Sequence, residues 1–473
     1  MKKFLSLVLA LVMTMSLVTV SAGAKDFTDS EDLSGEAYAE AVNVMSEMGI
    51  IDGYAGGAFQ PQGTLTRGAA AKIIACMMLG KTTAEALGTQ AAPFKDVPVG
   101  STFAGYIAYC VESGLIDGYA DGTFRPSAQL TGFAFLKMLL TALGYDSAIE
   151  GYTGPNWTVN VAGRAYEIGL TAGNDEFVGA QACTREQAAL YAVNTLKTTL
   201  VEYTDRGSEI TVNGAVISTA ASVPTYVTSS VYNQATSVNA DRDNSGDYTV
   251  EFAERYQPDL TMDRDTDDFG RPSYTWAWKN RDIGTYVDYS LMVAEYTTGV
   301  SGRELYNVLT ASTIRNADLD VYVDGVEPDE ADTIDKSDLS RSNQDDVGVT
   351  DNGVLTQVFV DTDANDGDGL ITIASINTWL AQATANYSES KEYAPLKVFT
   401  GKGGANTTYN VDVEDVANVA DVADEAFYLV NISYKDSNRG EVVAIQDAEV
   451  MEDSTVTKWS SDDDLVVSKL TTD

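Results

Sequence analysis

The stretch GIIDGYAGGAFQP at residues 49–61 decides the fold of the N-terminal region, because it recurs as GLIDGYADGTFRP at residues 114–126. The two copies lie 65 residues apart. Shorter matches flank both copies: FTD at 27–29 with FKD at 94–96 before them, and LTR at 65–67 with LTG at 130–132 after them. A weaker third copy keeps GLTAG at 169–173 and CTRE at 183–186. Self-similarity at a near-constant period indicates structural repeats, and we predict three of them.

Each repeat has the pattern of a helix, a tight loop and a second helix. In the first repeat, one helical face is formed by apolar side chains at helical spacing: Tyr38, Ala41, Val42, Met45 and Met48. Gly49 suits the left-handed end of that helix, and Thr66 is placed to cap the next one. The second helix has its own apolar face, formed by Ala70, Ile73, Ile74, Met77 and Met78. A single unit cannot bury such faces alone, so the three repeats should pack into one all-α domain.

These motifs resemble those of the S-layer homology (SLH) family. The resemblance covers about residues 25–203 and divides them into repeats at 25–88, 89–148 and 149–203. It implies a pseudo-threefold helical bundle that binds secondary cell-wall polymers, often pyruvylated, or another peptidoglycan-linked glycan, in grooves between the repeats. It also implies that the protein is secreted and lies in the cell wall or surface layer of a bacterium.

Two arginines are the leading candidates for binding such a polymer. Arg67 and Arg185 directly follow Thr66 and Thr184, which we predict to be helix N-caps. Their guanidinium groups should therefore lie beside helix N-termini, where unpaired N–H groups also favour anions. The resemblance assigns the same arginine to the polymer. The alternative is that both arginines pair with carboxylates such as that of Asp29 and tie the repeats together.

The repeats depart from the family's T-R-A-E motif in different ways. The first reads TRGA at 66–69 and lacks the acid, the second reads TGFA at 131–134 and lacks the arginine, and the third keeps TRE at 184–186. At most two grooves should therefore bind ligand. Asp29 and Asp96 of the F-x-D motif are further groove candidates, although an aspartate before a helix is more often an N-cap.

The composition excludes several classes of protein. The chain has 473 residues and a formal net charge of −40, with 70 acidic and 30 basic side chains and no histidine. A nucleic-acid-binding protein needs clustered Lys and Arg, which this balance does not supply. The absence of histidine removes Ser-His-Asp and Cys-His catalysis and every His-ligated metal site. The acidity itself indicates an exported, soluble surface, or alternatively low-affinity Ca²⁺ binding by grouped carboxylates.

The N-terminus has the features of a secretory signal peptide. Lys2 and Lys3 precede an apolar run, and Ala22-Gly23-Ala24 offers a cleavage site, so we predict a leader over 1–24. No later segment is long and apolar enough to span a membrane. Three cysteines, Cys76, Cys110 and Cys183, fall in or beside apolar helical patterns. Buried free thiols are the favoured interpretation, although one disulfide remains compatible with the sequence.

From about residue 204 the pattern changes to short β-branched runs, turns and many aspartates. The predicted strands include a hairpin over 209–217 with an Asn-Gly turn and further segments at 319–323, 354–360, 369–376, 427–434 and 441–445. Helical pattern is sparse, with one short candidate over 377–385. The multidomain chain should therefore continue as mainly β, sandwich-like domains at 204–350 and 351–473. The second ends six residues after a predicted strand at 465–467 and is a candidate for an incomplete domain.

Two aspartate-rich segments invite a calcium interpretation. Asp241 and Asp243 begin a segment like an EF-hand loop, but its twelfth position is Phe252. Asp361 and Asp363 begin another, with strand-like flanks instead of helices. Neither is an EF-hand, and we favour plain turns over Ca²⁺ sites. No other cofactor is expected.

A further pattern is aromatic. Tyr274, Trp276 and Trp278 alternate and would lie on one face of a strand. Such a stripe is more often core than a sugar-stacking platform.

The leading functional prediction is non-enzymatic. We expect an exported protein that is anchored to the cell wall by its repeats and presents acidic β modules, as a component of a self-assembling surface layer or associated with one. The alternative is a wall-anchored adhesin or glycan-active enzyme whose activity lies in 204–473, since glycosidases need only two carboxylates.

Overall fold

The computed structural model describes residues 27–90, 93–174, 176–212, 215–228, 238, 249–330, 332–399, 407–413, 416–448, 454–459 and 467–472. The predicted leader and Asp241 and Asp243 lie outside them. These residues form two compact units, each described by itself. The helical unit takes in Gly23–Asp263 and Thr275–Gly284, and the β unit takes in Arg264–Tyr274 and Thr285–Asp473.

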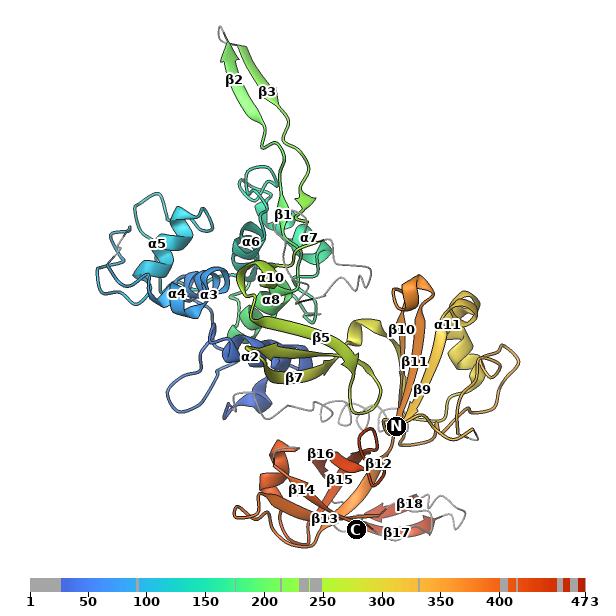
Figure 1. Ribbon diagram of the computed structural model, residues 1–473. Helices are drawn as coiled ribbons and strands as arrows, with labels where there is room; N and C mark the ends of the chain where they lie inside the picture. Colours follow the sequence, from blue (N-terminus) through green and yellow to red (C-terminus); the bar gives the residue numbers. More distant parts are fainter. Residues whose placement is uncertain are drawn as a thin grey trace. The chain divides into compact units, whose positions relative to one another are not determined.

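The helical unit contains the three repeats (Figure 1). Its helices are η1 (Ser30–Asp32), α2 (Glu36–Glu47), α3 (Arg67–Leu79), α4 (Lys81–Glu85), α5 (Ala104–Glu112), α6 (Gly132–Ala142), α7 (Trp157–Glu167), α8 (Arg185–Leu196) and α10 (Phe252–Tyr256). Its strands outside the repeats are β1 (Val201–Glu202), which pairs with β4 (Thr225–Tyr226), and β2 (Ser208–Val212), which pairs with β3 (Ala215–Thr219). Val212 lies opposite Ala215, which confirms the predicted hairpin.

The repeats close into a ring. The second helix of each repeat packs against the first helix of the next: α3 against α5, and α6 against α7. The second helix of the last repeat, α8, packs against the first helix of the first repeat, α2. Each apolar face is therefore covered by a neighbouring repeat, as expected for units that cannot bury these faces alone.

Three loop segments hold the centre of this ring. The Leu65 N–H donates to the Cys183 carbonyl oxygen at 2.8 Å, Cys183 to Leu130 at 2.8 Å, and Leu130 to Leu65 at 2.9 Å. Each of these residues lies just before the second helix of its repeat, so the three helix starts meet at one place. All three side chains are buried.

The predicted caps and apolar faces are confirmed. Thr66 accepts a hydrogen bond from the Ala69 N–H, and Thr184 forms a reciprocal capping box with Gln187. Gly49 has a positive φ of 68°. In α2 and α3 the predicted apolar side chains are buried except Met78, which is half-buried.

The β unit contains two larger sheets. A four-stranded sheet has the order β8-β10-β11-β9, from Met292–Tyr296, Leu355–Asp361, Leu370–Ile376 and Asp318–Val323. A five-stranded antiparallel sheet has the order β14-β13-β12-β15-β16, from Thr407–Asp412, Tyr393–Phe399, Thr378–Ala383, Phe427–Ser433 and Glu441–Asp447. The remaining elements of this unit are η2 (Tyr289–Leu291), α11 (Gly302–Asn316), η3 (Asn365–Gly367), η4 (Ala417–Asp421) and the pair β17 (Ser454–Trp459) and β18 (Val467–Thr472). A three-stranded sheet is formed by β5 (Leu260–Thr266), β6 (Pro272–Trp278) and β7 (Arg281–Val287). The division between the two units falls within the residues of this sheet.

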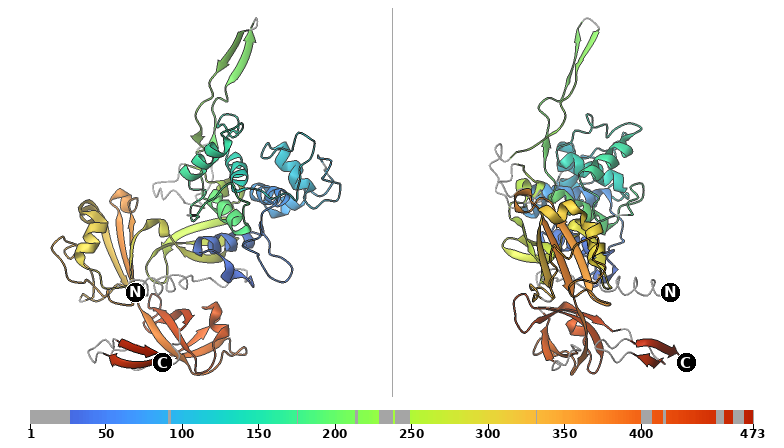
Figure 2. Two further views of the ribbon diagram at one scale, coloured as in Figure 1. Left: turned by 180° about the vertical axis from the view of Figure 1, so that it is seen from behind. Right: turned by 90° about the vertical axis from the view of Figure 1, so that its right-hand side faces the viewer.

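A helix, rather than a second sheet, covers the four-stranded sheet. Leu305, Leu309 and Ile314 of α11 form one core with Val358 and Ile373 of the strands, and Figure 2 shows α11 alongside β9 and β11. The sandwich-like prediction is therefore wrong for this sheet, although the mainly β character of the region is confirmed. The helix was readable in the sequence, because Ser301 and Glu304 form a capping box at its start.

The five-stranded sheet has a core of its own, which includes Leu396, Val430 and Ile432. The prediction of a short helix over 377–385 is wrong, because this segment forms strand β12. Ala381 and Ala383 are buried and Leu380 is exposed, which is the alternation of a strand with one face in a core.

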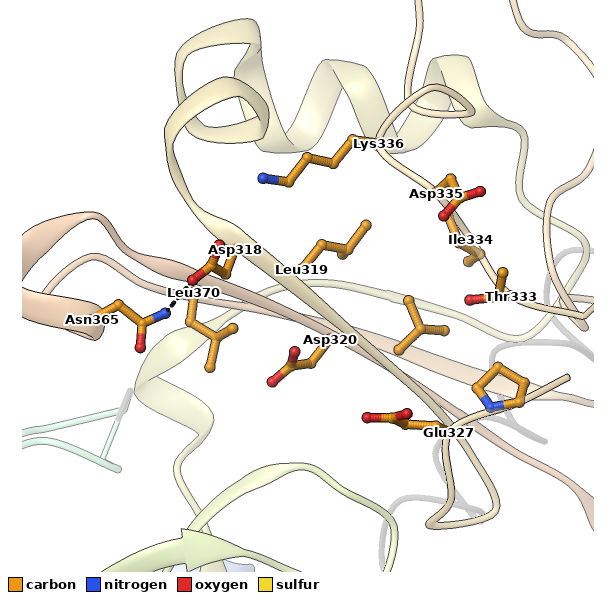
Figure 3. A pocket seen from close by; sticks show the side chains of 12 residues that line it. Asp318, Leu319, Asp320, Glu327, Thr333, Ile334, Asp335, Lys336, Asn365 and Leu370 are labelled. Atoms are coloured by element: carbon orange, nitrogen blue, oxygen red, sulfur yellow. Dashed lines mark hydrogen bonds between the residues drawn. The ribbon is translucent and has the colours of Figure 1, made fainter. Parts of the chain in front are cut away.

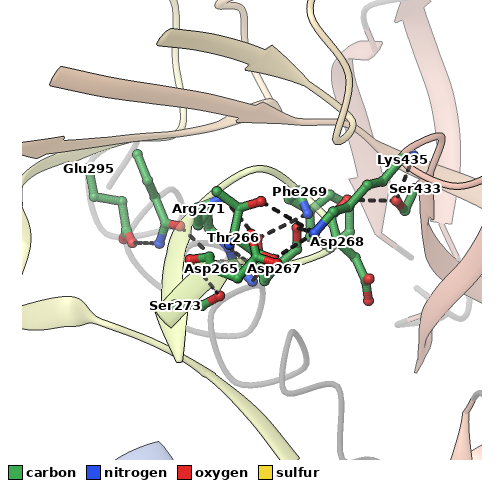
Figure 4. A network of polar contacts seen from close by, with 11 residues as sticks. Asp265, Thr266, Asp267, Asp268, Phe269, Arg271, Ser273, Glu295, Ser433 and Lys435 are labelled. Atoms are coloured by element: carbon green, nitrogen blue, oxygen red, sulfur yellow. Dashed lines mark hydrogen bonds and ion pairs between the residues drawn. The ribbon is translucent and has the colours of Figure 1, made fainter. Parts of the chain in front are cut away.

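A buried polar network ties the turn over residues 266–271 to both sheets of the β unit (Figure 4). Arg271 is fully buried and donates from Nε to Asp267 at 2.7 Å and from Nη1 to the Gln357 side chain of β10 at 3.2 Å. On the other side, the Ser433 hydroxyl of β15 donates to the Asp268 carbonyl oxygen at 2.6 Å. Because the buried charge is paired and hydrogen-bonded, removing either partner should be costly.

Two predictions, on the aromatic stripe and on the three cysteines, depend on which side chains are buried. Trp276 is fully buried and donates from Nε1 to Glu40 of α2 at 2.8 Å, which favours the core interpretation of this side chain over a sugar platform. Cys76, Cys110 and Cys183 are buried free thiols, as predicted. Burial raises the pKa of Cys76 to about 11 and that of Cys110 and Cys183 to about 12, which disfavours the thiolate form of each at neutral pH.

Candidate functional site

Arg185 joins the third repeat to the loop of the first. Its Nε donates to the Phe59 carbonyl oxygen and its Nη2 to the Asp52 carbonyl oxygen, both at 2.8 Å. The guanidinium carbon lies 4.7 Å from the ring centroids of both Tyr54 and Phe59. We call these four residues the Arg185 site. The cation is therefore fixed by two carbonyl dipoles and two aromatic rings.

Arg67 makes the same arrangement between the first and second repeats. Its Nε donates to the Phe124 carbonyl oxygen at 2.9 Å and its Nη2 to the Asp117 carbonyl oxygen at 2.8 Å. The guanidinium carbon lies 4.9 Å from the Tyr119 ring and 4.7 Å from the Phe124 ring. We call these residues the Arg67 site. Burial lowers the pKa of both arginines, but a guanidinium remains charged at neutral pH.

The first amides of these helices are not free, so the prediction of unpaired N–H groups beside the arginines is wrong. The Arg67 N–H donates to the Ala128 carbonyl oxygen at 2.9 Å and the Gly68 N–H to that of Pro126 at 2.8 Å. The next amide, that of Ala69, donates to the Thr66 cap. The helix beginning at Arg185 repeats this pattern with the loop of the first repeat. Loop carbonyls of a neighbouring repeat thus take the place that an anion would occupy.

Asp29 and Asp96 each hold a loop of their own repeat. The Asp29 carboxylate accepts the N–H groups of Phe59 and Gln60, both at 2.7 Å. Asp96 accepts those of Phe124 at 2.8 Å and Arg125 at 2.7 Å. Burial raises the pKa of Asp96, but these two bonds outweigh it and the net shift is downward.

This role differs from the N-cap alternative. Asp29 precedes η1 without a side-chain cap bond. Both aspartates instead fix the backbone beside the aromatic residue that stacks on an arginine. The loop residues Gln60 and Arg125, whose φ is 59° in each case, depend on these bonds to hold an unusual conformation.

The third junction, between the second and third repeats, has no arginine. Gly132 occupies the equivalent position, and a Cβ there would lie 3.2 Å from the Gly179 Cα atom. The Phe133 ring instead meets Phe177 and Trp157, with centroids 5.7 and 6.5 Å away. Aromatic packing closes this junction, so the described repeats hold two arginine sites and one apolar contact.

The two arginine sites differ in their surrounding charge. At the Arg185 site, the Asp52 carboxylate pairs with Lys72 at 3.2 Å and Lys81 at 3.3 Å. At the Arg67 site, Arg125 lies 4.0 Å from the Tyr119 ring centroid and pairs with Asp121 at 3.1 Å. Burial raises the pKa of Asp52, but the two lysines outweigh it and lower that pKa. Each site therefore has further cations beside it, and each of these is paired with a carboxylate.

Two segments of the helical unit match a known protein family. Residues 26–71 and 93–136 match the family described as the S-layer homology domain. The chain carries S-layer homology repeats. The SLH segments contain Arg67, Thr66, Asp29 and Asp96, whereas Thr184 and Arg185 lie in the weaker third repeat.

The relatives of this SLH chain are surface proteins of Gram-positive bacteria. A surface layer protein of Brevibacillus choshinensis is 24% identical over 215 residues, 45% of this chain and 18% of the relative. A cell surface protein of Thermoanaerobacter kivui is 27% identical over 212 residues, 44% of this chain and 26% of the relative. A cellulosome-anchoring protein of Acetivibrio thermocellus is 35% identical over 101 residues, 21% of this chain and 22% of the relative. Together these matches indicate a secreted protein at the cell-wall surface, and the aligned part is about a quarter or less of each relative.

Tyr54 and Tyr119, the exposed rings of the two arginine sites, were not among the predicted site residues. Tyr54 and Tyr119 are 48% and 40% exposed, so each ring touches an arginine and also faces solvent. The sequence did contain a signal for both tyrosines, because they occupy the same position in the repeated loop motif. The recurring loop phenylalanines, Phe59 and Phe124, are buried, so recurrence alone did not separate a binding residue from a core residue.

The structure describes one of the two calcium candidates, the segment that begins at Asp361. Asp361 ends β10 and Asp363 lies in the turn that leads to β11, where the Asp363 N–H donates to the Asp361 side chain at 3.0 Å. Within the described ranges there is no group of three metal-ligating side chains. No helix in the same residues is long and apolar enough to cross a membrane.

Proposed function

We propose that this chain anchors an exported protein non-covalently to the bacterial cell wall by binding an anionic secondary cell-wall polymer at the Arg185 and Arg67 sites. The observation that carries the proposal is the repetition of one arrangement at two repeat junctions: a guanidinium held by two carbonyls and flanked by two aromatic rings. The match to the S-layer homology domain supports the same function.

The chemistry of each site suits an acidic sugar. The carbonyl bonds use Nε and Nη2 of each arginine, and a guanidinium has five N–H donors, so donors remain for a carboxylate or phosphate. The half-exposed rings of Tyr54 and Tyr119 offer an apolar face for the sugar itself. A pyruvyl group would add a carboxylate to the sugar, and either site could bind it by the same contacts.

The other candidate residues would act by positioning. Thr66 and Thr184 begin the helices from which the arginines project, and Asp29 and Asp96 fix the loops that carry the aromatic rings. We place these four residues behind the sites rather than in contact with the polymer.

The closed ring of helix pairs and the three central hydrogen bonds support a pseudo-threefold bundle, in which only two junctions bind ligand. The acidic β unit would then be presented outside the wall, as a structural component of a self-assembling surface layer or of one associated with it. The names of the relatives, which are surface layer, cell surface and anchoring proteins, support a non-enzymatic role.

Cosedimentation of the full chain with purified cell-wall sacculi tests the proposal. We expect binding that is lost when the secondary polymer is stripped, and that falls in Arg67→Ala, Arg185→Ala, Tyr54→Ala and Tyr119→Ala. Arg206→Ala is the matched control, because Arg206 pairs with Asp146 in the same unit, outside both sites. Binding that survives stripping and all four substitutions would refute the anchoring role. Turnover of a polysaccharide by the β unit would favour the enzymatic alternative instead.

A further inference from the structure

Among the residues that the structure describes, strand β9 lies at the edge of its sheet, and only its Val323 exchanges backbone hydrogen bonds on the outer side, with Val326. It is the last strand of the sheet β8-β10-β11-β9 and runs parallel to β11. The Asp318 N–H donates to the Gly369 carbonyl oxygen and the Asp324 N–H to that of Ser375, both at 2.9 Å. Because alternate residues of a parallel strand turn their N–H and C=O groups to the same neighbour, Leu319 and Val321 turn theirs away from β11.

A cavity of about 730 Å³ lies along that edge (Figure 3). One wall is formed by β9 from Asp318 to Val321, and the other by Glu327, Pro328 and residues 333–336 of the following loop. A strand rises about 3.3 Å per residue, so the four β9 residues present room for about four residues of a further strand. The cavity thus opens beside the N–H and C=O groups of Leu319 and Val321, for which the described residues supply no backbone partner.

The cavity is acidic. Four carboxylates line it, those of Asp318, Asp320, Glu327 and Asp335, against the single cation of Lys336. Within the part of the chain that the structure describes, none of the four belongs to an ion pair. Burial raises the pKa of Asp320, and the nearby Glu327 and Asp318 carboxylates raise it further. In Figure 3 the Asp320 and Glu327 carboxyl groups point toward the same space.

We propose that the β9 edge binds an extended basic peptide segment of a partner protein, which adds to the sheet as a fifth strand. Its backbone pairs with Leu319 and Val321, and its lysine or arginine side chains reach Asp320 and Glu327. The alternate residues of the peptide would face the other side of the sheet, where Val321 and Ile334 belong to the core with α11. A second copy of this chain is disfavoured as the partner by its net charge of −40.

The competing interpretation is a protected edge. Proteins place charges on edge strands to prevent them from pairing with other chains, and the aspartates of β9 would serve that purpose. The two interpretations make opposite predictions for a basic strand. A protective edge excludes it, whereas the proposed site binds it. This proposal is independent of the wall-anchoring function, because the β unit carries it alone.

The test uses the full chain and synthetic peptides that alternate lysine with valine or threonine, with binding followed by fluorescence anisotropy. Two peptides carry N-methyl groups on complementary sets of alternate amides, so that only one of them can still donate to β9. We expect the unmethylated peptide and one methylated peptide to bind, and the other methylated peptide to bind at least tenfold more weakly. Exchange of the Leu319 and Val321 amide protons should slow in the complex.

Charge is tested separately. We expect the double substitution Asp320→Asn with Glu327→Gln to weaken binding about tenfold, and a peptide with glutamate in place of lysine not to bind. Asp345→Asn with Glu389→Gln removes the same two charges from exposed positions outside the cavity and should change little. Equal binding of both methylated peptides would reduce the site to cation attraction and overturn strand addition. No binding of the basic peptide to the wild-type chain, or self-association at this edge, would also overturn the proposal.

Discussion

Arg185 of the third repeat donates from Nη2 to the carbonyl oxygen of Asp52 in the first repeat, at 2.8 Å. This bond joins the last repeat to the first, so the residue proposed to bind the polymer also closes the ring of repeats. The two roles are compatible, because the carbonyl bonds fix the guanidinium before a ligand arrives. A preorganised cation binds with a smaller loss of side-chain entropy than a mobile one.

Removing either arginine should destabilise the helical unit. Arg67→Ala leaves two loop carbonyls without their donors and removes the stack on Tyr119 and Phe124. We expect a loss of about 1–3 kcal/mol in the free energy of unfolding, measured by far-UV circular dichroism in denaturant. Arg67→Lys should restore little of it, because an ammonium group cannot reproduce the geometry of the guanidinium fork. An unchanged unfolding curve would show that the arginine has no structural role.

A third arginine site should not be recoverable by one substitution. In Gly132→Arg, the new Cβ would lie 3.2 Å from the Gly179 Cα atom, and the Phe133 and Phe177 rings already occupy the junction. We expect a less stable unit, by about 1–3 kcal/mol, and no increase in the amount of polymer bound per chain. Gain of a third binding equivalent would mean that the aromatic contact rearranges more easily than its packing indicates.

The repeats were predictable because each signal is local. The glycine positions, Thr66 and Thr184 as caps, and the apolar faces all follow from short-range spacing in the sequence. The occupied helix amides were not predictable, because the carbonyls that accept them, such as that of Ala128, come from another repeat. The hydrogen bond of Trp276 was not predictable either, because its partner Glu40 lies more than 200 residues earlier in the sequence.

In the β region, strand positions could be predicted from β-branched runs. One helix was predicted where a strand forms, and one helix was missed. The segment forming β12 has alanines and a leucine at spacings that suit a short helix, and only pairing with β13 and β15 makes it a strand. The helix α11 was missed although Ser301 and Glu304 mark its start. The cavity beside β9 required knowledge of which strand lies at the sheet edge, which no local pattern contains.

Asp324 should make the stability of the β unit depend on pH. Its side chain accepts hydrogen bonds from the Asn377 N–H and Nδ2 at 2.8 and 2.9 Å. Burial raises its pKa from 3.8 to about 6, and these bonds only partly oppose the shift. Between these two values the folded chain binds more protons than the unfolded chain. The contribution of protonated Asp324 to the free energy of unfolding is therefore complete below about pH 4. This contribution is lost as the pH rises through about 6.

We expect Asp324→Asn to remove this part of the pH dependence, and to raise the free energy of unfolding near pH 7 by about 1–3 kcal/mol. Asparagine tolerates the positive φ of 48° at this position. The measurement is urea unfolding of both chains at pH 4.5 and pH 7.5. Parallel pH profiles for the variant and the wild type would contradict a titrating Asp324.

The cysteines should be inert in the folded chain. All three are buried, with pKa values raised to about 11 or 12. A thiol-specific chromogenic reagent at pH 8 should find almost no reactive thiol in the native chain and three per chain in denaturant. A native chain that reacts rapidly, or a denatured chain with only one thiol, would contradict the buried, reduced state.

The stoichiometry of polymer binding is the most direct test of the anchoring account. Calorimetric titration of the full chain with short, solubilised fragments of the secondary cell-wall polymer should give two binding equivalents for the wild type and for Arg206→Ala. It should give one equivalent for Arg67→Ala or Arg185→Ala, and none for the double variant. Two equivalents retained in the double variant, or no binding by the wild-type chain, would contradict the assignment of the two arginine sites to the cell-wall polymer.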